Sequence, residues 1–279
     1  MISMRPYLLL TLAVFALLST TSASYVSILE PYNATISSAN GSIYLGKVGP
    51  GQTFTVTISS ATTNSSGAML NYGWNELNAS NLPQGWIAKN SGLYRQTLSV
   101  AVTPASNARN GTYSFELTAV NIGNYSKIGS ASFTAYVNVT PDVFHLQVSP
   151  KSATSGVGSP TNIYITINNT GVSDSPFVVN VTGLPAWNVP PQAVIALHHT
   201  TGTFIYPIYQ YTPGVYKADV HVSSLESPLV YKSENVTLTV RAGLLSDYKA
   251  IGMGSVTFPI IYEPAYAGMY LINLLFGRA

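Results

Sequence analysis

The chain has 279 residues, of which 46% are hydrophobic and only 8% are charged, and its formal net charge is +2. It is long enough for two domains of ordinary size, and its apolar content excludes a disordered chain, which would be poor in such residues. Nucleic-acid binding requires a basic stripe, and Lys and Arg form no cluster here. The absence of cysteine excludes disulfides and thiolate metal sites, so each domain must be held by its own apolar core.

Residues 1–24 have the order of features that is typical of a secretory signal peptide. Arg5 precedes an apolar run from Tyr7 to Leu18, and the small residues at 22–24 follow as a cleavage region. An uncleaved membrane anchor is the alternative, but spanning a bilayer needs about 20 apolar residues. Either interpretation places the rest of the chain outside the cytoplasm, so we expect a secreted or cell-surface protein.

Acceptor triplets for N-glycosylation agree with export. Ten Asn-x-Ser/Thr triplets occur, and none has Pro in the middle: Asn33, Asn40, Asn64, Asn78, Asn110, Asn124, Asn138, Asn168, Asn180 and Asn235. On an exported chain they predict a glycosylated exterior, although bacterial export would often leave such triplets bare.

A unit of about a hundred residues occurs twice. Leu-Pro-Gln-Gly-Trp at 82–86 returns as Leu-Pro-Ala-Trp at 184–187, and Gly-Thr-Tyr at 111–113 returns as Gly-Val-Tyr at 214–216. The offset is nearly constant, which predicts a first domain over residues 25–141 and a second over 142–242, followed by an apolar tail over 243–279.

Alternating apolar residues predict the strands of both repeats. In the first repeat the strands are expected at 43–48, 53–59, 93–102, 113–119 and 133–139, with Tyr94 facing inward and Trp86 at the rim of the core. In the second they are expected at 143–148, 163–167, 177–181, 204–208, 216–222 and 236–240, with a turn at 155–160. Since no long segment has a helical period, parallel sheets with helical crossovers are excluded. The pattern predicts antiparallel sandwiches.

Short motifs carry a resemblance to a known family. Ile-Tyr-Ile-Thr-Ile-Asn-Asn-Thr-Gly at 163–171 resembles the strand and turn of the NPCBM-associated immunoglobulin-like domains, and the motifs at 82–86 and 111–113 resemble later landmarks of that family. Cell-adhesion-related (CARDB-like) modules are related to it. The resemblance implies two tandem seven-stranded immunoglobulin-like β-sandwiches from an exported prokaryotic surface protein, with no catalytic residues. The chain departs from the family at 61–67, which replaces an Asn-x-Gly turn, and at Trp187, which no Gly precedes.

The tail has three competing interpretations. Glu263 and Pro264 resemble a helix start, and the apolar residues that follow would form a helix too short to cross a bilayer of about 30 Å. The tail would lie against a membrane, dock into a partner, or fold back on the second domain. Residues predicted to make membrane or partner contact are Tyr266, Met269, Tyr270, Leu271, Leu274, Leu275 and Phe276.

No catalytic or metal-binding pattern is readable, so we predict no enzyme, no cofactor and no metal. The histidines at 145, 198, 199 and 221 lack the spacing of a ligand set. Glu76 and Glu116 are the one conceivable acid pair for glycoside hydrolysis, and solvated surface acids are the simpler interpretation. A Gly-x-Ser-x-Gly elbow is absent.

We therefore expect a non-enzymatic, extracytoplasmic envelope protein with a structural, adhesive or assembly role, whose partners are envelope proteins or surface glycans. The alternative is a carbohydrate-binding accessory module of an exported enzyme system. The 19 tyrosines bear on this choice, because aromatic rings stack on sugar faces as well as filling cores. An exposed aromatic platform would favour the alternative.

Overall fold

The computed structural model describes residues 25–37, 41–63, 69–123, 129–184 and 190–243, and these residues form strands and no helix. The all-β prediction is therefore confirmed. No helix in this described part of the chain is long and apolar enough to cross a membrane. The chain divides into two compact units, residues 1–141 with 171–173, and residues 142–170 with 174–279. The expected signal peptide and the helical part of the expected tail lie outside the described residues.

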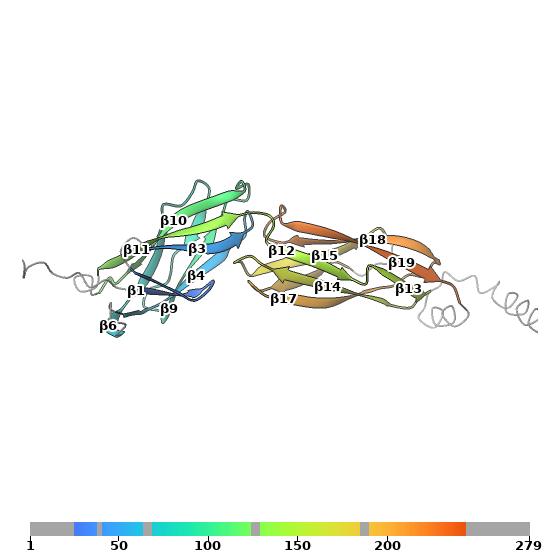
Figure 1. Ribbon diagram of the computed structural model, residues 1–279, viewed down its shortest axis with the longest axis horizontal. Helices are drawn as coiled ribbons and strands as arrows, with labels where there is room; N and C mark the ends of the chain where they lie inside the picture. Colours follow the sequence, from blue (N-terminus) through green and yellow to red (C-terminus); the bar gives the residue numbers. More distant parts are fainter. Residues whose placement is uncertain (1–24, 38–40, 64–68, 124–128, 185–189, 244–279) are drawn as a thin grey trace, which may run out of the picture. The chain divides into compact units, whose positions relative to one another are not determined.

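Two sheets make up the first unit (Figure 1). One has the order β6 (Met69–Gly73), β5 (Ala61–Thr63), β1 (Tyr25–Glu30), β4 (Phe54–Ser59), β9 (Thr97–Thr103), β8 (Ile87–Lys89), with β2 (Ala34–Ser37) also paired to β1. The other has the order β3 (Gly41–Val48), β11 (Ser130–Val139), β10 (Gly111–Val120), β7 (Glu76–Ser80).

The second unit repeats this plan. One sheet has the order β12 (Phe144–Ser149), β14 (Thr161–Asn169), β17 (Thr201–Ile208). The other has the order β13 (Ser152–Gly156), β19 (Tyr231–Arg241), β18 (Gly214–Ser224), β15 (Ser175–Thr182), β16 (Gln192–Ala196).

The strand order identifies both units as immunoglobulin-like sandwiches. In the first unit β1, β4, β9 and β8 occupy the places of strands A, B, E and D, and β7, β10 and β11 those of C, F and G. In the second unit β12, β14 and β17 correspond to A, B and E, and β15, β18 and β19 to C, F and G. We name the loops of the first unit by the strands they join: the BC loop (60–75), the DE loop (90–96) and the FG loop (121–129).

One strand pair in each unit is parallel, which refines the antiparallel prediction. Strand β3 runs parallel to β11, and β13 runs parallel to β19. A parallel pair needs a long crossover, often a helix, but here most of the domain lies between the two strands. The missed strand β13 overlaps the turn that was predicted at 155–160, so that turn begins later than expected.

Each unit has an apolar core made by alternate strand residues. In the first, Phe115 lies 6.2 Å from Phe54 and 6.3 Å from Trp86 between ring centroids, and Trp86 is only 7% exposed. In the second, the rings of Phe144 and Phe177 are 4.7 Å apart. Tyr206 is buried there as predicted, and this burial raises the pKa of its phenol.

The repeated tyrosine has the same structural role in both units. The Tyr113 hydroxyl donates to the carbonyl oxygen of Arg109 at 3.0 Å, and the Tyr216 hydroxyl donates to that of Thr212 at 2.8 Å. Both tyrosines lie near the start of strand F and bond four residues upstream, which is the tyrosine corner of immunoglobulin-type domains. The repeated sequence motif therefore forms the same hydrogen-bonded tyrosine corner in both units.

One inward prediction was wrong. Tyr94 was expected to point inward from a strand at 93–102, but β9 begins only at Thr97 and the Tyr94 side chain is 70% exposed. Its backbone is the reason: Tyr94 has a φ of 56°, a left-handed conformation that a strand cannot contain. Tyr94 therefore belongs to the DE loop.

Candidate functional site

The histidines do not form a metal site in the described part of the chain. His145 is exposed on β12, and His221 on β18 has its Nδ1 2.9 Å from the Ser233 hydroxyl. His198 and His199 lie between β16 and β17, and His198 Nδ1 is 2.7 Å from the Asp174 carboxylate. Within the described ranges no three His, Cys, Asp or Glu side chains are placed to hold a metal ion.

The conceivable acid pair is not assembled into a cleft. Glu76 and Glu116 lie on the neighbouring strands β7 and β10, but Glu76 pairs with Val120 and Glu116 with Ser80. They are therefore four positions apart along the sheet, or about 13 Å. Glu116 also accepts a hydrogen bond from Asn81 Nδ2 at 2.8 Å.

The acceptor asparagines differ in their accessibility. Asn33, Asn110 and Asn235 are exposed, while Asn78, Asn138, Asn168 and Asn180 are half-buried on strands. Asn40, Asn64 and Asn124 lie outside the described residues, as do the predicted contact residues of the tail, Tyr266 to Phe276. Whether any acceptor is modified stays a prediction.

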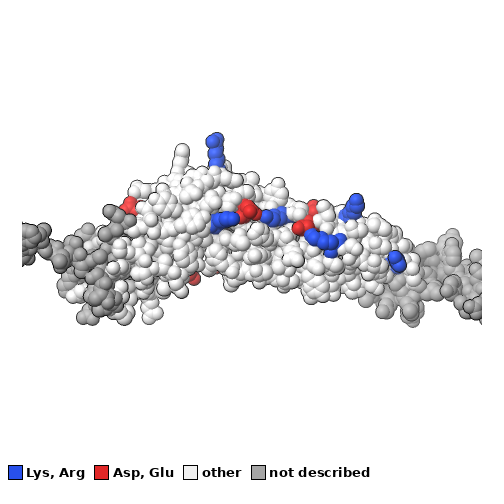
Figure 2. Space-filling model, viewed as in Figure 1, with Lys and Arg blue, Asp and Glu red and all other residues white. Residues whose placement is uncertain are grey.

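Charged side chains occupy little of the surface (Figure 2). The chain carries 12 Lys and Arg against 10 Asp and Glu, and the outward positions of the long strands are mostly Ser, Thr, Asn and Tyr. On β10, for example, Thr112, Ser114 and Thr118 alternate with the buried Phe115 and Leu117. Most outward groups of this strand are therefore hydroxyls, and Glu116 is its one outward charge.

A hollow of about 380 Å³ lies where three loops of the first unit meet. The BC loop contributes Ser60 and residues 72–75, the DE loop Tyr94 and Arg95, and the FG loop Asn121 and Gly123. We call this the loop hollow. Its volume falls in the range of small-ligand pockets, and the loops of one sandwich end are where immunoglobulin-type domains commonly carry their binding residues.

Backbone and amide hydrogen bonds join the three loops. The Tyr94 N–H donates to the carbonyl of Asn75 at 3.0 Å, which connects the DE and BC loops. The Ile122 N–H donates to Asn75 Oδ1 at 2.9 Å, and Asn121 Nδ2 donates to the carbonyl of Gly73. These bonds fix the FG loop against the BC loop, so the hollow is preorganised in the free protein.

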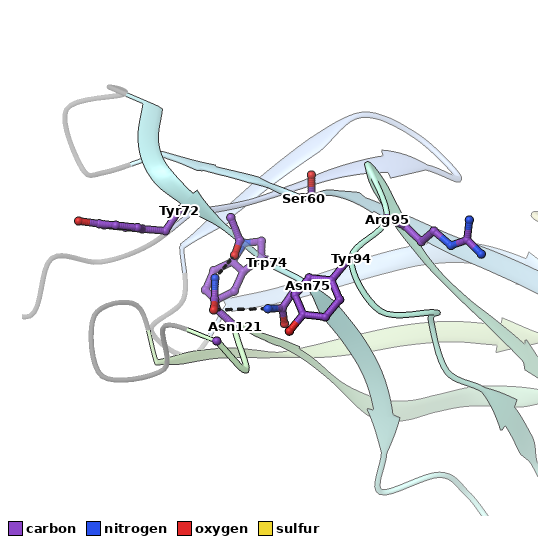
Figure 3. Close-up of a pocket in the computed structure, with 9 residues that line it drawn as sticks. Ser60, Tyr72, Trp74, Asn75, Tyr94, Arg95 and Asn121 are labelled. Atoms are coloured by element: carbon purple, nitrogen blue, oxygen red, sulfur yellow. Dashed lines mark hydrogen bonds between the residues drawn. The ribbon is translucent and has the colours of Figure 1, made fainter.

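The two amides form the polar part of the loop hollow (Figure 3). Asn75 and Asn121 are buried, and a long contact of 3.4 Å joins Asn75 Nδ2 to Asn121 Oδ1. An amide nitrogen has two N–H donors, and the described residues use one of those of Asn75. Tyr72 and Arg95 extend away from this pair.

Trp74 contributes a second donor. Its side chain is 2% exposed, and its buried Nε1 has no hydrogen-bond partner among the described residues. A buried donor without an acceptor costs about 1–3 kcal/mol, so natural structures seldom keep one without a reason. Trp74 is one of the residues that line the loop hollow, and its side chain also packs in the apolar core of the first unit.

Two exposed apolar side chains are sequence neighbours of residues that line the loop hollow. Leu93 and Ile122 are each about half exposed and adjoin the lining residues Tyr94 and Asn121 in the chain. Tyr94 itself is the most exposed aromatic residue in the described part of the three loops. Its left-handed backbone is the kind of strained conformation that is found preferentially at ligand sites.

The lining of the loop hollow has a recognisable composition. Its residues are Ser60, Tyr72, Gly73, Trp74, Asn75, Tyr94, Arg95, Asn121 and Gly123. These are the residue types enriched in antibody paratopes, where Tyr and Trp give rigid contact area and Ser, Gly and Asn give adaptable hydrogen bonds. The sequence pattern missed this set, because the three loops are far apart along the chain and Tyr94 was placed in a core. The closely spaced aromatic and amide residues at 72–75 were the one available signal.

Comparisons with known proteins show no family for this chain. No protein-family model matches the sequence, and no curated protein matches it. Among solved structures, the fibronectin(III)-like modules of Clostridium thermocellum CbhA are similar over 78% of this chain and 94% of theirs, at 11% identity and a TM-score of 0.26.

Two further solved structures show a similarity that is equally weak. Chimeric titin Z1Z2 is similar over 80% of this chain and 100% of its own, at 13% identity and a TM-score of 0.35. The S-layer protein rSbsC is similar over 68% of this chain and 23% of its own, at 15% identity and a TM-score of 0.32. Since TM-scores this low carry no argument, the immunoglobulin-like assignment rests on the strand order and the tyrosine corners.

Proposed function

We propose that this protein is an exported, non-enzymatic module of the cell envelope that works by contact, in a structural, adhesive or assembly role. One observation carries the proposal: two consecutive immunoglobulin-like sandwiches each bury an apolar core of their own and present hydroxyl, amide and aromatic groups outward. A fold of this kind presents binding loops on a rigid scaffold. The described histidines and acids are dispersed, and a protein that works by contact does not need them to converge.

Export is part of the same proposal. The N-terminal leader pattern supports secretion to the cell surface, and the exposed Asn33, Asn110 and Asn235 are the acceptors best placed for glycosylation. Within immunoglobulin-like modules, the motifs at 82–86, 111–113 and 163–171 support a place near the NPCBM-associated and CARDB-like domains. The apolar tail would hold the module to a membrane or to an envelope partner.

The test is the location and the processing of the native protein. Source cells are separated into cytosolic, envelope and medium fractions, and the protein is followed with an antibody raised against the purified chain. We expect the envelope fraction, a mature N-terminus near residue 25, and degradation by protease added to intact cells. A cytosolic protein that keeps residues 1–24 would contradict the proposal.

A second candidate, the carbohydrate-binding accessory module, is favoured by one specific observation. The loop hollow combines an exposed tyrosine with buried amides in a pocket of small-ligand size. This candidate shares the exported, contact-based character of the first.

A further inference from the structure

We propose that the loop hollow of the first sandwich binds a neutral sugar residue of a glycan. The inference deepens the proposed contact function, because it gives the contact a partner class. It starts from the size of the hollow, about 380 Å³, which suits a compact ring and is too small for a folded partner element such as a helix, whose diameter with side chains is about 10–12 Å.

The chemistry of the lining selects a sugar among compact ligands. A pyranose has a face of C–H groups and a rim of hydroxyls. The Tyr94 ring is exposed at the hollow and offers an aromatic surface for the C–H face. The side chain of Asn75 offers an amide group for the hydroxyls, since an amide both donates and accepts. The Asn121 amide is already bonded to Gly73 and to Asn75 and holds Asn75 in place.

The indole of Trp74 adds a donor that needs an oxygen. Its buried Nε1 has no acceptor among the described residues, and a ligand hydroxyl that reached this atom would provide one. An apolar ligand would leave the donor unsatisfied.

The charges around the loop hollow favour a neutral ligand over an acidic one. Arg95 is the one ionisable residue in the lining besides the tyrosines, and its side chain extends away from the amide pair. A site for a carboxylate-bearing sugar would aim the guanidinium at the ligand, because the bidentate Arg–carboxylate pair is the strong geometry. Among the described lining residues there is no Asp or Glu to repel or bind a charged group.

Hydrogen bonds between the loops reduce the conformational entropy that binding would cost. The bonds of Asn75 and Asn121 already join the lining residues of the three loops, so ligand binding need not bring these residues together. A site that is rigid before binding loses less conformational entropy on binding.

The experiment uses the purified mature chain, residues 25–279. Neutral oligosaccharides built from glucose, mannose, galactose and N-acetylglucosamine are titrated against it, beside hexuronate oligosaccharides of matched length. Calorimetry gives the affinity, and the ¹H–¹⁵N signals of the Trp74 indole and of the Asn75 and Asn121 amides report the site. We expect at least one neutral oligosaccharide to bind and to shift the Trp74 indole signal.

Two variants test the role of the exposed ring. Tyr94→Ala should weaken binding at least about tenfold, as truncation of a central aromatic contact does. Tyr136→Ala is the matched control, because Tyr136 is 40% exposed on β11 and does not line the hollow. It should leave the affinity unchanged. Thermal unfolding of both variants confirms that each is folded.

Three outcomes would overturn the inference. They are binding of hexuronates alone, the absence of binding by every neutral sugar, and neutral binding that survives Tyr94→Ala. Specific capture of a deglycosylated protein at these loops without any sugar binding would also overturn it and would indicate a protein partner. None of these results moves the localisation test, so the inference and the proposed function fail separately.

Discussion

The two sandwiches share their framework and differ in the loops that the framework carries. Both have a tyrosine corner at the start of strand F and a parallel pair between an early strand and strand G. In the first, however, strands B and C are joined by residues 60–75, which contain β5 and β6, whereas in the second the connection is only 170–174. Only the first has a long insertion there, and that insertion supplies most of the loop hollow.

This difference separates what maintains the fold from what distinguishes one module. The inward side chains and the corner tyrosines are common to both units, so they are requirements of the sandwich. Tyr94 and Asn121 lie outside that shared framework, whereas Trp74 of the BC loop also packs in the apolar core of the first unit. Connecting loops tolerate insertions that strands do not. The predictions below test this separation, from the largest effect to the smallest.

Removing an aromatic ring from the centre of the core should lower the unfolding free energy most. Phe115→Ala deletes a ring that is 2% exposed and packs on Phe54 and Trp86, so we expect the first unit to lose about 3–5 kcal/mol of unfolding free energy. Urea unfolding measures this loss. The control Val215→Ala removes an apolar side chain that is 69% exposed on β18, and its effect should stay within about 0.5 kcal/mol. Comparable losses in the two variants would argue against the core assignment.

Adding a methyl group to the BC loop should lower the unfolding free energy less than the loss of a core ring does, but it should also disturb the loop hollow. A Cβ at Gly73 would lie 2.2 Å from the Ser60 carbonyl oxygen. We therefore expect Gly73→Ala to force the backbone apart, to cost about 1–3 kcal/mol, and to shift the amide signals of Asn75 and Asn121.

The matched control lies in the second unit. A Cβ at Gly202 meets nothing within 4 Å, so Gly202→Ala should be neutral or stabilising by about 0.4–1 kcal/mol through the unfolded chain. Should Gly73→Ala be as well tolerated, the close approach of the BC loop to Ser60 would be wrong.

Particular residues show how far the sequence predicts this structure. Alternation placed Phe54, Val56 and Ile58 on one face of a strand, and all three are buried on β4. The repeat of Gly-x-Tyr predicted equivalent strands, and Tyr113 and Tyr216 occupy equivalent positions. These successes follow from the two-residue period of a strand, which is a local property.

The failures have a physical cause as well. Tyr94 fits the alternation of a strand, but its left-handed backbone ends the pattern, and a pattern of polarity contains no backbone angles. The loop hollow depends on residues near 74, 94 and 121, which only the folded topology brings together. Strand β13 is short, has a Ser-Ala-Thr-Ser-Gly sequence, and gains its stability from pairing with β19 at the other end of the domain.

Removing the hydroxyl of a tyrosine corner should lower the unfolding free energy by a smaller amount, and by the same amount in both units. Tyr113→Phe and Tyr216→Phe each remove one hydrogen bond to a backbone carbonyl and retain the ring, so each should cost about 0.5–1.5 kcal/mol. Tyr136→Phe, on the exposed face of β11, is the control and should change little. If the two variants lose very different amounts of unfolding free energy, the two tyrosine corners do not have the same structural role.

Acid should give the smallest effect, and it should act on the two units differently. The described contacts between basic and acidic side chains, Lys151–Glu234, His198–Asp174 and Lys232–Asp142, all belong to the second unit. Carboxylates lose their negative charge in strong acid, so lowering the pH from 7 to 2 weakens these contacts. Each is solvent-exposed and contributes about 0.2–1 kcal/mol.

In the first unit, the described carboxylates Glu30 and Glu116 accept hydrogen bonds from the neutral groups of Thr57 and Asn81. A protonated carboxyl group still accepts such bonds, so the first unit should lose less stability than the second on acidification. Urea titrations at pH 7 and pH 2, followed by NMR signals assigned to each unit, measure both losses. A larger loss in the first unit would show that its polar surface depends on charge, against the hydroxyl and amide character on which the neutral-sugar proposal is built.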